Sequence, residues 1–367
     1  MTETTQAPDE KAWPLRQLYF YLTEGCNMRC RHCWLAPEYE TAQAQHGHLD
    51  FDLFRAIIRE AKPLGLTRVK LTGGEPLMHP RIAEMIDVVR EEELGLTVET
   101  NGVLCTPEIA SRIASANAPS VAVSLDGADA ATHEWVRGVP GSFAAARRGI
   151  LSLAATGLKP QVIMSVMRRN RGEMRALVAL AEELGAGSVK FNLVMPTERG
   201  EALHEKGETL SVAELVETGK WVAQELAPAA KIRIIYHQPP AFRPLGAMYG
   251  EEGSGCGGCG IKGILGVLAD GSYALCGIGA SVPEMVFGHA GRDRLADVWR
   301  ESAVLNEIRE GLPRRLEGIC GECLMQGACL GSCIAQNYYR SNSLWAPFWF
   351  CEEARKANLF PESRVRP

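Results

Sequence analysis

Three cysteines stand close together near the start of the chain. Cys26, Cys30 and Cys33 lie in the run GCNMRCRHCW, with three residues between the first two and two between the last two. Three thiolates hold three irons of a four-iron cluster and leave the fourth open to an outside ligand, whereas ordinary electron-transfer clusters use four cysteines. The spacing is therefore compatible with an iron–sulfur site that binds a further molecule.

A zinc site is the alternative for these three thiolates. Structural zinc takes four Cys or His ligands, and His32, His46 and His48 are available as the fourth. The spacing alone leaves both interpretations open, and the motifs further along the chain favour the cluster.

Eight of the twelve cysteines lie in the last third of the chain. Eight thiolates make two sets of four, which is the number of ligands that a closed cluster takes. Cys105 belongs to neither group, and we expect it to be a small buried apolar side chain. The eight late cysteines are Cys256, Cys259, Cys276, Cys320, Cys323, Cys329, Cys333 and Cys351.

Short polar motifs follow several expected strands. In the run GGEP, two glycines let the backbone approach a ligand closely, and the glutamate offers an acceptor for an ammonium group. The runs ETNG and SLDG end the next two strands with small polar side chains. The candidate binding residues in these motifs are Gly73, Gly74, Glu75, Asn101, Ser124 and Asp126.

The elements that must position these motifs alternate between strand and helix from about residue 17 to residue 236. Helix start signals stand at Asp50 and Ser142. Such βα repeats predict a parallel sheet, in which ligands bind beyond the carboxyl ends of the strands. The expected strands are Gln17 to Leu22, Arg68 to Thr72, Leu96 to Thr100, Ser120 to Leu125, Gln161 to Val166 and Ser188 to Leu193.

The triplet and the GGEP run together resemble the radical S-adenosylmethionine (SAM) superfamily, which has a C-x3-C-x2-C loop after its first strand. The resemblance implies that the amino and carboxylate groups of SAM chelate the open iron and that GGEP binds the amino group. It places the ETNG and SLDG residues near the ribose and carboxylate of SAM. Arg137, a planar bidentate donor, resembles the family arginine that binds the SAM carboxylate.

Two further positions resemble the part of the family site that surrounds adenine. His32 stands where relatives carry an aromatic residue, and an imidazole can also stack on the base. The main chain near Asn192 to Met195 would close over the adenine by analogy with the fold.

The late cysteines resemble the SPASM extension of this superfamily. Cys259 is followed by eleven residues, Gly271, four residues and Cys276, and the run CGECLMQGACLGSC comes later. The resemblance implies two auxiliary clusters, which makes three [4Fe-4S] clusters in all. If Cys256 is not a ligand, the first auxiliary cluster keeps an open iron for substrate. The first set is Cys256, Cys259, Cys276 and Cys333, and the second is Cys320, Cys323, Cys329 and Cys351.

The resemblance also implies a fold: an α/β chain with a partial (β/α)6 parallel barrel, followed by a small cysteine-rich α+β domain. A proline-rich and then glycine-rich stretch after Tyr236 marks the expected boundary. We expect a polar tail over residues 1–16, the radical SAM core over 17–237, a linker over 238–255 and the SPASM domain over 256–367.

Enzymes of this type mostly act on peptides, so the resemblance implies a maturase that oxidatively cross-links a ribosomally made precursor peptide. Its expected partners are the peptide, a separate leader-binding protein, and an electron donor such as flavodoxin or ferredoxin. The alternatives are a sulfatase-maturing enzyme, a peptide epimerase, a small-molecule dehydrogenase and a non-catalytic iron–sulfur electron carrier. The sequence names no catalytic acid or base.

Composition narrows the cellular setting. The 44 acidic and 39 basic residues are well mixed and give a net charge of -5, so we expect no nucleic-acid partner. The polar first residues lack the apolar core of a secretory signal, and no apolar run is long enough for a membrane span. We therefore expect a cytoplasmic protein whose thiols stay reduced rather than forming disulfides.

Overall fold

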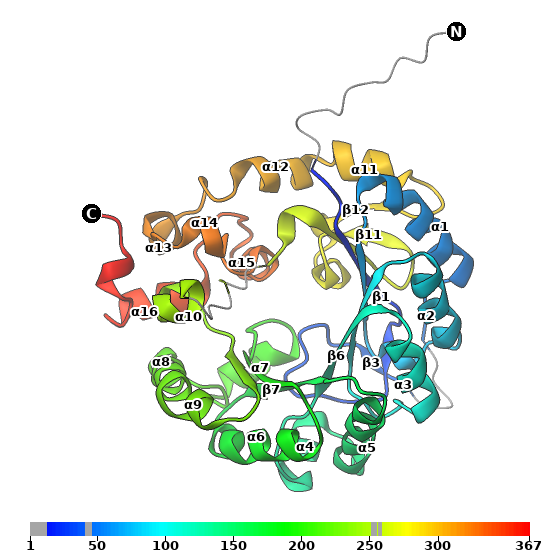
Figure 1. Ribbon diagram of the computed structural model, residues 1–367. Coiled ribbons are helices and arrows are strands. Elements are labelled where there is room, and N and C mark those ends of the chain that lie inside the picture. The colour runs from blue at the N-terminus through cyan, green and yellow to red at the C-terminus, as the bar shows by residue number, and fades with distance from the viewer. Residues whose placement is uncertain (1–12, 41–45, 251–254, 256–258) are drawn as a thin grey trace.

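The computed structural model describes residues 13–40, 46–250, 255 and 259–367 (Figure 1). These residues form one ten-stranded sheet in the order β12-β11-β10-β1-β4-β5-β6-β7-β8-β9, and a small two-stranded sheet, β2-β3. The six strands expected from the sequence are all present and parallel. They are β1 (Gln17–Tyr21), β4 (Arg68–Thr72), β5 (Gly95–Thr100), β6 (Asn117–Ser124), β7 (Gln161–Val166) and β8 (Ser188–Leu193).

A seventh parallel strand, β9 (Arg233–Tyr236), pairs with β8 and was not predicted. Its four residues, RIIY, begin with an exposed arginine and are too short for the two-residue period to be visible.

Helices cover the outside of the curved sheet and form a ring in the view of Figure 1. α1 begins after Asp50, whose side chain accepts a hydrogen bond from the Leu53 amide, and the following turn ends at Gly65 with φ of +103°. Ser142, predicted as a cap, is instead the first residue of α5, because Gly141 with φ of +79° takes the cap position. The helices of this part are α1 (Phe51–Ala61), α2 (Ile82–Glu91), α3 (Pro107–Ala114), α4 (Ala130–Arg137), α5 (Ser142–Ala155), α6 (Met174–Glu183), α7 (Arg199–Glu205), α8 (Val212–Trp221) and α9 (Ala227–Ala229).

The two faces of the sheet differ in character. Side chains toward the helices are apolar and fully buried, as Val69, Val98 and Phe191 show, and each contributes about 1.5–3 kcal/mol to folding. Alternate residues on the other face, such as Lys70 and Lys190, are only half-buried. The apolar core therefore lies between the sheet and the surrounding helices, and the side chains that face the inside of the barrel are polar.

The cysteine-rich region continues the same sheet. β10 (Ile264–Val267) pairs with β1 in parallel, and β11 (Ser272–Ala274) and β12 (Val286–His289) add antiparallel strands beyond it. In Figure 1 the helices of this region complete the upper arc of the ring. They are α10 (Leu245–Tyr249), α11 (Leu295–Glu301), α12 (Ala303–Gly311), α13 (Gly318–Glu322), α14 (Gln326–Cys329), α15 (Ile334–Ser341) and α16 (Trp349–Lys356).

The C-terminal helices also pack back onto the barrel. α16 contacts α8, and the Trp349 ring meets the His204 ring edge-on at 5.6 Å between centroids. The described part of the expected linker is packed rather than extended, because Phe242 meets the rings of Phe350 and Phe360 at 4.9 and 5.5 Å. The division of the chain at residues 238–255 stays a prediction.

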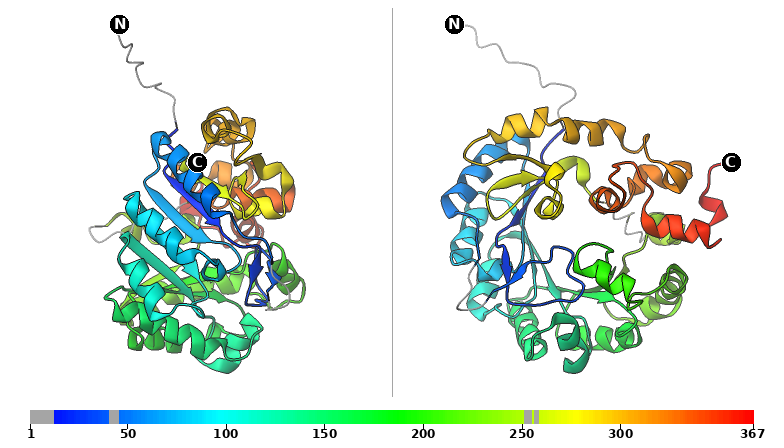
Figure 2. Two further views of the ribbon diagram at one scale, coloured as in Figure 1. Left: turned by 90° about the vertical axis from the view of Figure 1, so that its right-hand side faces the viewer. Right: turned by 180° about the vertical axis from the view of Figure 1, so that it is seen from behind.

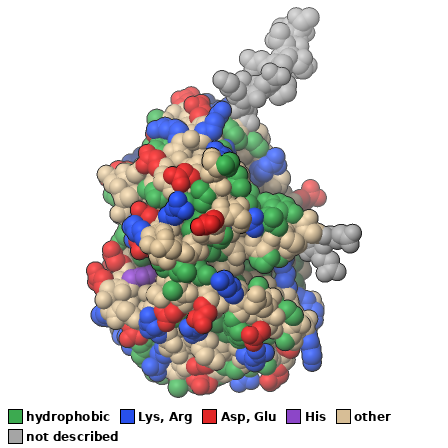
Figure 3. Space-filling view, turned by 90° about the vertical axis from the view of Figure 1, so that its left-hand side faces the viewer, with side chains coloured by type: hydrophobic (Ala, Val, Ile, Leu, Met, Phe, Trp, Pro, Cys, Tyr) green, Lys and Arg blue, Asp and Glu red, His purple; other side chains and the backbone are tan. Residues whose placement is uncertain are grey.

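Late aromatic residues pack in the interior rather than facing solvent. Trp345, Phe348, Trp349 and Phe350 are all buried. Figure 3 shows the face toward the viewer with acidic and basic side chains interspersed and no broad area of one sign. In the described residues, no helix is long and apolar enough to cross a membrane.

Candidate functional site

The first cysteine loop begins after β1, at the carboxyl edge of the parallel strands. Cys26 lies in β2 (Gly25–Cys26), which pairs with β3 (Glu38–Tyr39). The end of α4 holds the middle of the loop, because the Arg29 and Arg31 amides donate to the carbonyls of Arg137 and Val136, both at 2.9 Å. Figure 2 shows β2–β3 and α7 side by side inside the ring of helices.

The GGEP turn packs directly against this loop. The Glu75 amide donates to the Gly25 carbonyl at 3.2 Å, and a Cβ on Gly74 would lie 1.9 Å from the same carbonyl oxygen. Gly73 has φ of +132°, in the left-handed region that favours glycine. Both glycines are therefore needed to bring the turn into contact with the loop, whatever else they bind.

The Glu75 carboxylate already has three donors from the protein. The side chain is 1% exposed, and it accepts from the Thr100 hydroxyl at 2.6 Å, the Asn101 amide at 2.8 Å and the Leu77 amide at 3.0 Å. Burial raises the pKa of Glu75, and these hydrogen bonds oppose the rise. The carboxylate thus ties the end of β4 to the end of β5, a positioning role that sequence reasoning missed.

Asn101 connects the same edge to the cysteine loop. Its side-chain amide donates to Asn27 Oδ1 at 2.7 Å, and its own oxygen accepts from the Val103 amide at 3.0 Å. Asn27, the residue after Cys26, was not singled out in the sequence, since nothing local distinguishes it from any loop asparagine.

Asp126 and Arg137 form a buried ion pair beside the loop. Their closest atoms, Asp126 Oδ2 and Arg137 Nη2, are 2.6 Å apart, and Asp126 Oδ1 accepts from the Ser165 amide at 2.7 Å. Arg137 Nη1 donates to Cys30 Sγ at 3.4 Å. Burial alone would raise the pKa of Asp126, but the Arg137 and His32 charges outweigh it and lower the pKa.

Asp126 Oδ2 pairs with Arg137 only as an ion pair, and three further buried polar atoms at this edge have no hydrogen-bond partner among the described residues: His32 Nδ1, Arg137 Nε and Asn192 Oδ1. Native proteins rarely leave such atoms unpaired, so a group of them is typical of a ligand site. Two of the three, His32 and Asn192, are the residues that the family resemblance places near adenine. One donor (Arg137 Nε), one acceptor (Asn192 Oδ1) and one imidazole nitrogen therefore fit a ligand that has both a base and a carboxylate, as SAM has.

The three thiols of the first loop are close enough to influence one another. Burial raises the pKa of Cys26, and the Glu75 carboxylate and the Cys30 thiol raise it further. Burial also raises the pKa of Cys30, while Arg137 opposes the rise. Buried thiols of this kind become good ligands when a metal displaces their protons.

The late cysteines gather in two places. Cys276, which follows β11, lies near Cys259 and Cys333, and burial together with the Cys333 thiol raises the pKa of Cys276. Cys256 lies outside the described residues. The structure thus brings together three of the four cysteines assigned to the first auxiliary set.

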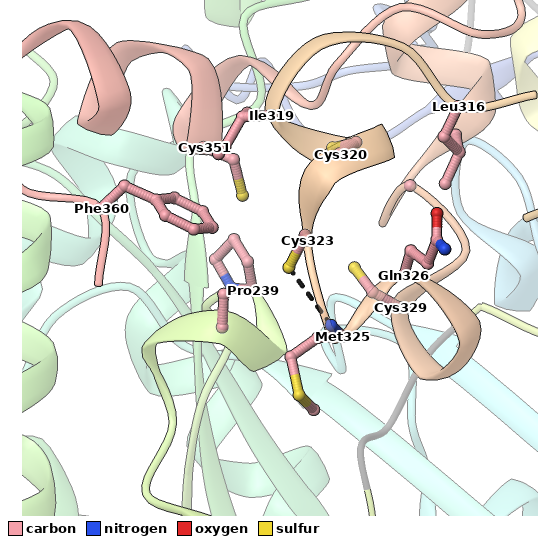
Figure 4. A pocket seen from close by; sticks show the side chains of 12 residues that line it. Pro239, Leu316, Ile319, Cys320, Cys323, Met325, Gln326, Cys329, Cys351 and Phe360 are labelled. Atoms are coloured by element: carbon pink, nitrogen blue, oxygen red, sulfur yellow. Dashed lines mark hydrogen bonds between the residues drawn. The ribbon is translucent and has the colours of Figure 1, made fainter. Parts of the chain in front are cut away.

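The other four late cysteines line one small apolar cavity of about 20 Å³ together with Pro239, Leu316 and Phe360. Figure 4 shows sulfur atoms from α13, α14, α16 and the connecting chain facing this space. The Phe348 amide donates to Cys320 Sγ and the Met325 amide to Cys323 Sγ, both at 3.3 Å. Amide donors to thiolates are typical of iron–sulfur sites. The four are Cys320, Cys323, Cys329 and Cys351.

Comparison with known proteins agrees with this geometry. Residues 20–181 match the radical SAM superfamily, and residues 256–324 match the SPASM iron–sulfur cluster-binding domain. The chain is 30% identical to the AdoMet-dependent heme synthase of Methanosarcina barkeri, over 92% of this chain and 94% of that one. It is 28% identical to the mycofactocin maturase MftC of Mycobacterium ulcerans, over 95% and 91%.

Two solved structures have the same fold. Streptococcus suis SuiB bound to S-adenosylmethionine superimposes with a TM-score of 0.71 at 18% identity, covering 93% of this chain and 78% of that one. The anSMEcpe protein with bound AdoMet gives 0.70 at 16% identity, covering 94% and 95%.

The chain belongs to the radical SAM superfamily and carries a SPASM domain. It is therefore an enzyme that uses SAM and iron–sulfur clusters of the [4Fe-4S] type. This membership excludes a simple electron carrier, while the assignment of Cys26, Cys30 and Cys33 as ligands of the cluster stays a prediction.

Sequence reasoning also missed charged side chains inside the barrel. Lys70 and Lys190 each stand between two buried apolar residues in the strands RVKLT and SVKFNL, and Glu99 stands near the end of β5. A charged residue between apolar residues of a strand is the sequence signal for them, because it indicates that the opposite face of the strand borders a polar space.

Proposed function

We propose that this enzyme is a maturase that oxidatively modifies, by cross-linking, a ribosomally made precursor peptide. The observation that carries the proposal is the pairing of a three-thiol loop beside unpartnered polar atoms with two further cysteine sets in the same chain. A relative matched over 95% of this chain is named a maturase, and a structure of the same fold contains a precursor peptide.

The proposal assigns the first cluster to Cys26, Cys30 and Cys33, with SAM bound at the adjoining strand ends. When bound, the cluster and SAM would supply the radical chemistry needed to remove a hydrogen atom from the substrate. The protein's part is to hold the loop rigidly through α4 and the GGEP turn, and to keep water from the barrel interior. The residues proposed to surround SAM are Gly73, Gly74, Glu75, Asn101, Ser124, Asp126 and Arg137.

Not all of these residues would contact SAM in the same way. Glu75 and Asp126 are already engaged with protein donors, so we assign them to positioning the loop and Arg137. Ser124 lies half-buried at the end of β6 on the interior face and is free of such constraints in the described hydrogen bonds. We therefore assign direct contact first to the glycine backbone, Ser124 and Arg137.

We further propose that the late cysteines hold two auxiliary clusters, which accept the electron released as product forms. The first would use Cys256, Cys259, Cys276 and Cys333. The second would use the four thiols of the apolar cavity, Cys320, Cys323, Cys329 and Cys351.

A second candidate function is heme synthesis, because the heme synthase relative is 30% identical over nearly the whole of both chains. Both candidates share the radical chemistry and differ in substrate. An assay that follows the substrate is therefore needed to distinguish the two candidate functions, because SAM cleavage is expected for both.

The test is anaerobic reconstitution followed by two assays. The reduced enzyme with SAM is expected to form 5′-deoxyadenosine, and its absence would contradict the enzymatic assignment altogether. Candidate precursor peptides and tetrapyrrole precursors of heme are then supplied separately. Loss of two hydrogens from a peptide supports the maturase; conversion of a tetrapyrrole with no change in any peptide contradicts it. An unchanged peptide mass with deuterium uptake from heavy water indicates epimerisation instead.

For the electron donor we propose an acidic protein of the flavodoxin or ferredoxin type. Arg31 and Arg169 flank the Trp135 ring, each 4.6 Å from its centroid, and Arg29 is exposed on the other side of Cys30. Arg29 and Arg31 are themselves residues of the first cysteine loop, on either side of Cys30 in the sequence. Complementary charge raises the rate of encounter between such partners.

The R31E/R169E variant tests this surface. We expect reduction by flavodoxin to slow by about tenfold or more at low salt, while reduction by dithionite is unchanged. R294E, a charge reversal at an exposed arginine of the distant α11 start, is the control. Equal rates in the double variant and the control would contradict the docking surface.

A further inference from the structure

The interior of the barrel holds a group of charges that the SAM site does not use. Lys70 lies between buried Val69 and Leu71 in β4, and Lys190 between buried Val189 and Phe191 in β8. Because strand side chains alternate between faces, both lysines project to the face opposite the helices, into the interior.

Lys70 is held by two neighbours. Its ammonium forms a salt bridge with Glu99 of the adjacent β5 at 2.7 Å and lies 4.4 Å from the centroid of the Tyr19 ring in β1. The Glu99 side chain remains 42% exposed, so solvent and ligands reach this pair from the interior. Lys70 is thus a paired cation at the edge of an accessible space.

Lys190 has no such partner. Its register neighbours are Ile163 in β7 and Ile235 in β9, and no hydrogen bond or salt bridge to it occurs within the described residues. Burial lowers the pKa of Lys190; Glu99 raises it and Lys70 lowers it again, so the curved sheet brings all three side chains within electrostatic reach. Burial also holds the pKa of nearby His237 at about 4, which leaves that ring neutral.

Lys190 is the unpaired charge in this space. Among the described side chains two ammonium groups face one carboxylate, and an ammonium partly removed from water without a counter-ion is unfavourable. An entering anion would pair with the Lys190 ammonium, which has no counter-ion among the described side chains. The arrangement is typical of a site for one additional carboxylate.

The position of this group relates it to both cofactor regions. Lys70 stands three residues before Gly73, and Glu99 stands two before Asn101, so the charges lie one layer below the strand ends of the SAM site. Lys70 also acts on the pKa of Cys276, so it adjoins the first auxiliary set. A group bound here would lie between the two.

We propose that Lys190, with the Lys70–Glu99 pair, binds a carboxylate of the substrate inside the barrel. This inference rests on the proposed function only in taking the barrel interior as the place where substrate is held. The carboxylate comes either from the C-terminus of a peptide or from an acidic side chain, and both present the same chemistry to the ammonium.

Ligand-observed fluorine NMR on the anaerobically reconstituted enzyme with SAM tests the site directly. The first probe is N-acetylglycyl-para-fluorophenylalanine, which has a free C-terminal carboxylate. The second is N-acetylglutamyl-para-fluorophenylalaninamide, which has a side-chain carboxylate. The neutral controls are the C-terminal amide of the first probe and the glutaminyl form of the second.

At least one acidic probe is expected to bind wild-type enzyme about tenfold more tightly than its neutral control, which is the range for a hydrogen bond to a charged group. In K190Q this preference is expected to vanish, and K190R is expected to keep part of it. K220Q removes an exposed lysine of α8 and serves as the matched control with wild-type binding. The probe that shows the preference identifies the source of the carboxylate.

The E99Q variant is expected to change the affinity for the acidic probes in the opposite direction to K190Q. Glu99 is the one carboxylate paired with Lys70 in the described part of the chain, so its removal releases Lys70 and the acidic probes are expected to bind several-fold more tightly than to wild type. A merely structural role for these residues predicts no gain. Equal binding of acidic and neutral probes to wild type, or an unchanged preference in K190Q with normal iron content, overturns the proposal.

The outcome is separable from that of the proposed function. Probe binding is measured without turnover, so it stands even if no peptide is modified. Conversely, K190Q is expected to retain substrate-independent formation of 5′-deoxyadenosine, since Lys190 holds neither the loop nor SAM. Loss of that activity in wild type would contradict the proposed function and leave the carboxylate site to be judged on the NMR result alone.

Discussion

The two best-defined cysteine groups of this molecule are built in opposite ways. The first loop places three thiols against a polar wall, with Arg137 on Cys30 and unpaired atoms of His32 and Asn192 nearby. The second places four thiols around a cavity lined by apolar side chains. An incomplete thiol set beside unsatisfied polar groups favours an exchangeable ligand, whereas a complete set in an apolar setting favours electron storage.

The largest expected effect separates the two groups by activity. C30A is expected to abolish 5′-deoxyadenosine formation, because the open-iron cluster loses a ligand. C351A is expected to keep that activity and lose product formation, because the cluster proposed for the cavity serves only as an electron acceptor in this account. Both are measured by chromatography after reduction, with iron content as the control. Equal loss of 5′-deoxyadenosine in both variants would contradict the division of roles.

The buried ion pair of the first region gives the next largest effect. R137M leaves the fully buried Asp126 carboxylate without its partner, which is expected to cost about 3–5 kcal/mol of unfolding free energy. R147M, which removes a surface arginine 3.9 Å from Glu183, is expected to cost about 0–1 kcal/mol. Anaerobic urea titration measures both. Similar losses in the two variants would show that Asp126 is not buried as an ion.

The contact between the GGEP turn and the loop is predicted to be intolerant of one methyl group. In G74A the new Cβ meets the Gly25 carbonyl, and we expect overpacking to cost about 1–3 kcal/mol and to weaken SAM binding. G172A adds a Cβ with no atom within 4 Å and is the control. Calorimetric titration with SAM checks the result, and unchanged affinity in G74A would mean that the turn does not position the site.

The smallest expected effect concerns the contact between the two regions. Tyr339 Oη in α15 accepts a hydrogen bond from the Glu198 amide at 3.3 Å, just before α7. Y339F is expected to cost about 0.5–1.5 kcal/mol and leave 5′-deoxyadenosine formation unchanged. Y338F alters the neighbouring ring, which has no such bond in the described residues. Equal free energies of unfolding for Y339F and Y338F would show that this hydrogen bond does not contribute to stability.

The sequence was informative wherever a local pattern carried the signal. Three of the expected strands have the predicted bounds, since β-branched runs such as QVIMSV stand between clear helix signals. The pairing of β10 with β1 was not foreseen, because contacts between residues so distant in the chain leave no local trace.

The same limit applies to the site. The cysteines that the sequence grouped by resemblance are brought together where they are described. The partners of Glu75 and Arg137 were missed, because Thr100 and Asp126 become neighbours only when the strand ends meet. Cys105 is buried as expected, and burial raises the pKa of its thiol to about 12.

The central claim is that the first loop leaves a cluster corner for SAM and that the four-thiol cavity does not. Electron–nuclear double resonance of the reduced enzyme, with SAM labelled by carbon-13 at its carboxylate, tests this most directly. The account predicts a carbon-13 coupling in wild type and in C351A, and none in C30A. A wild-type spectrum without the coupling, or a coupling lost in C351A but kept in C30A, would contradict it.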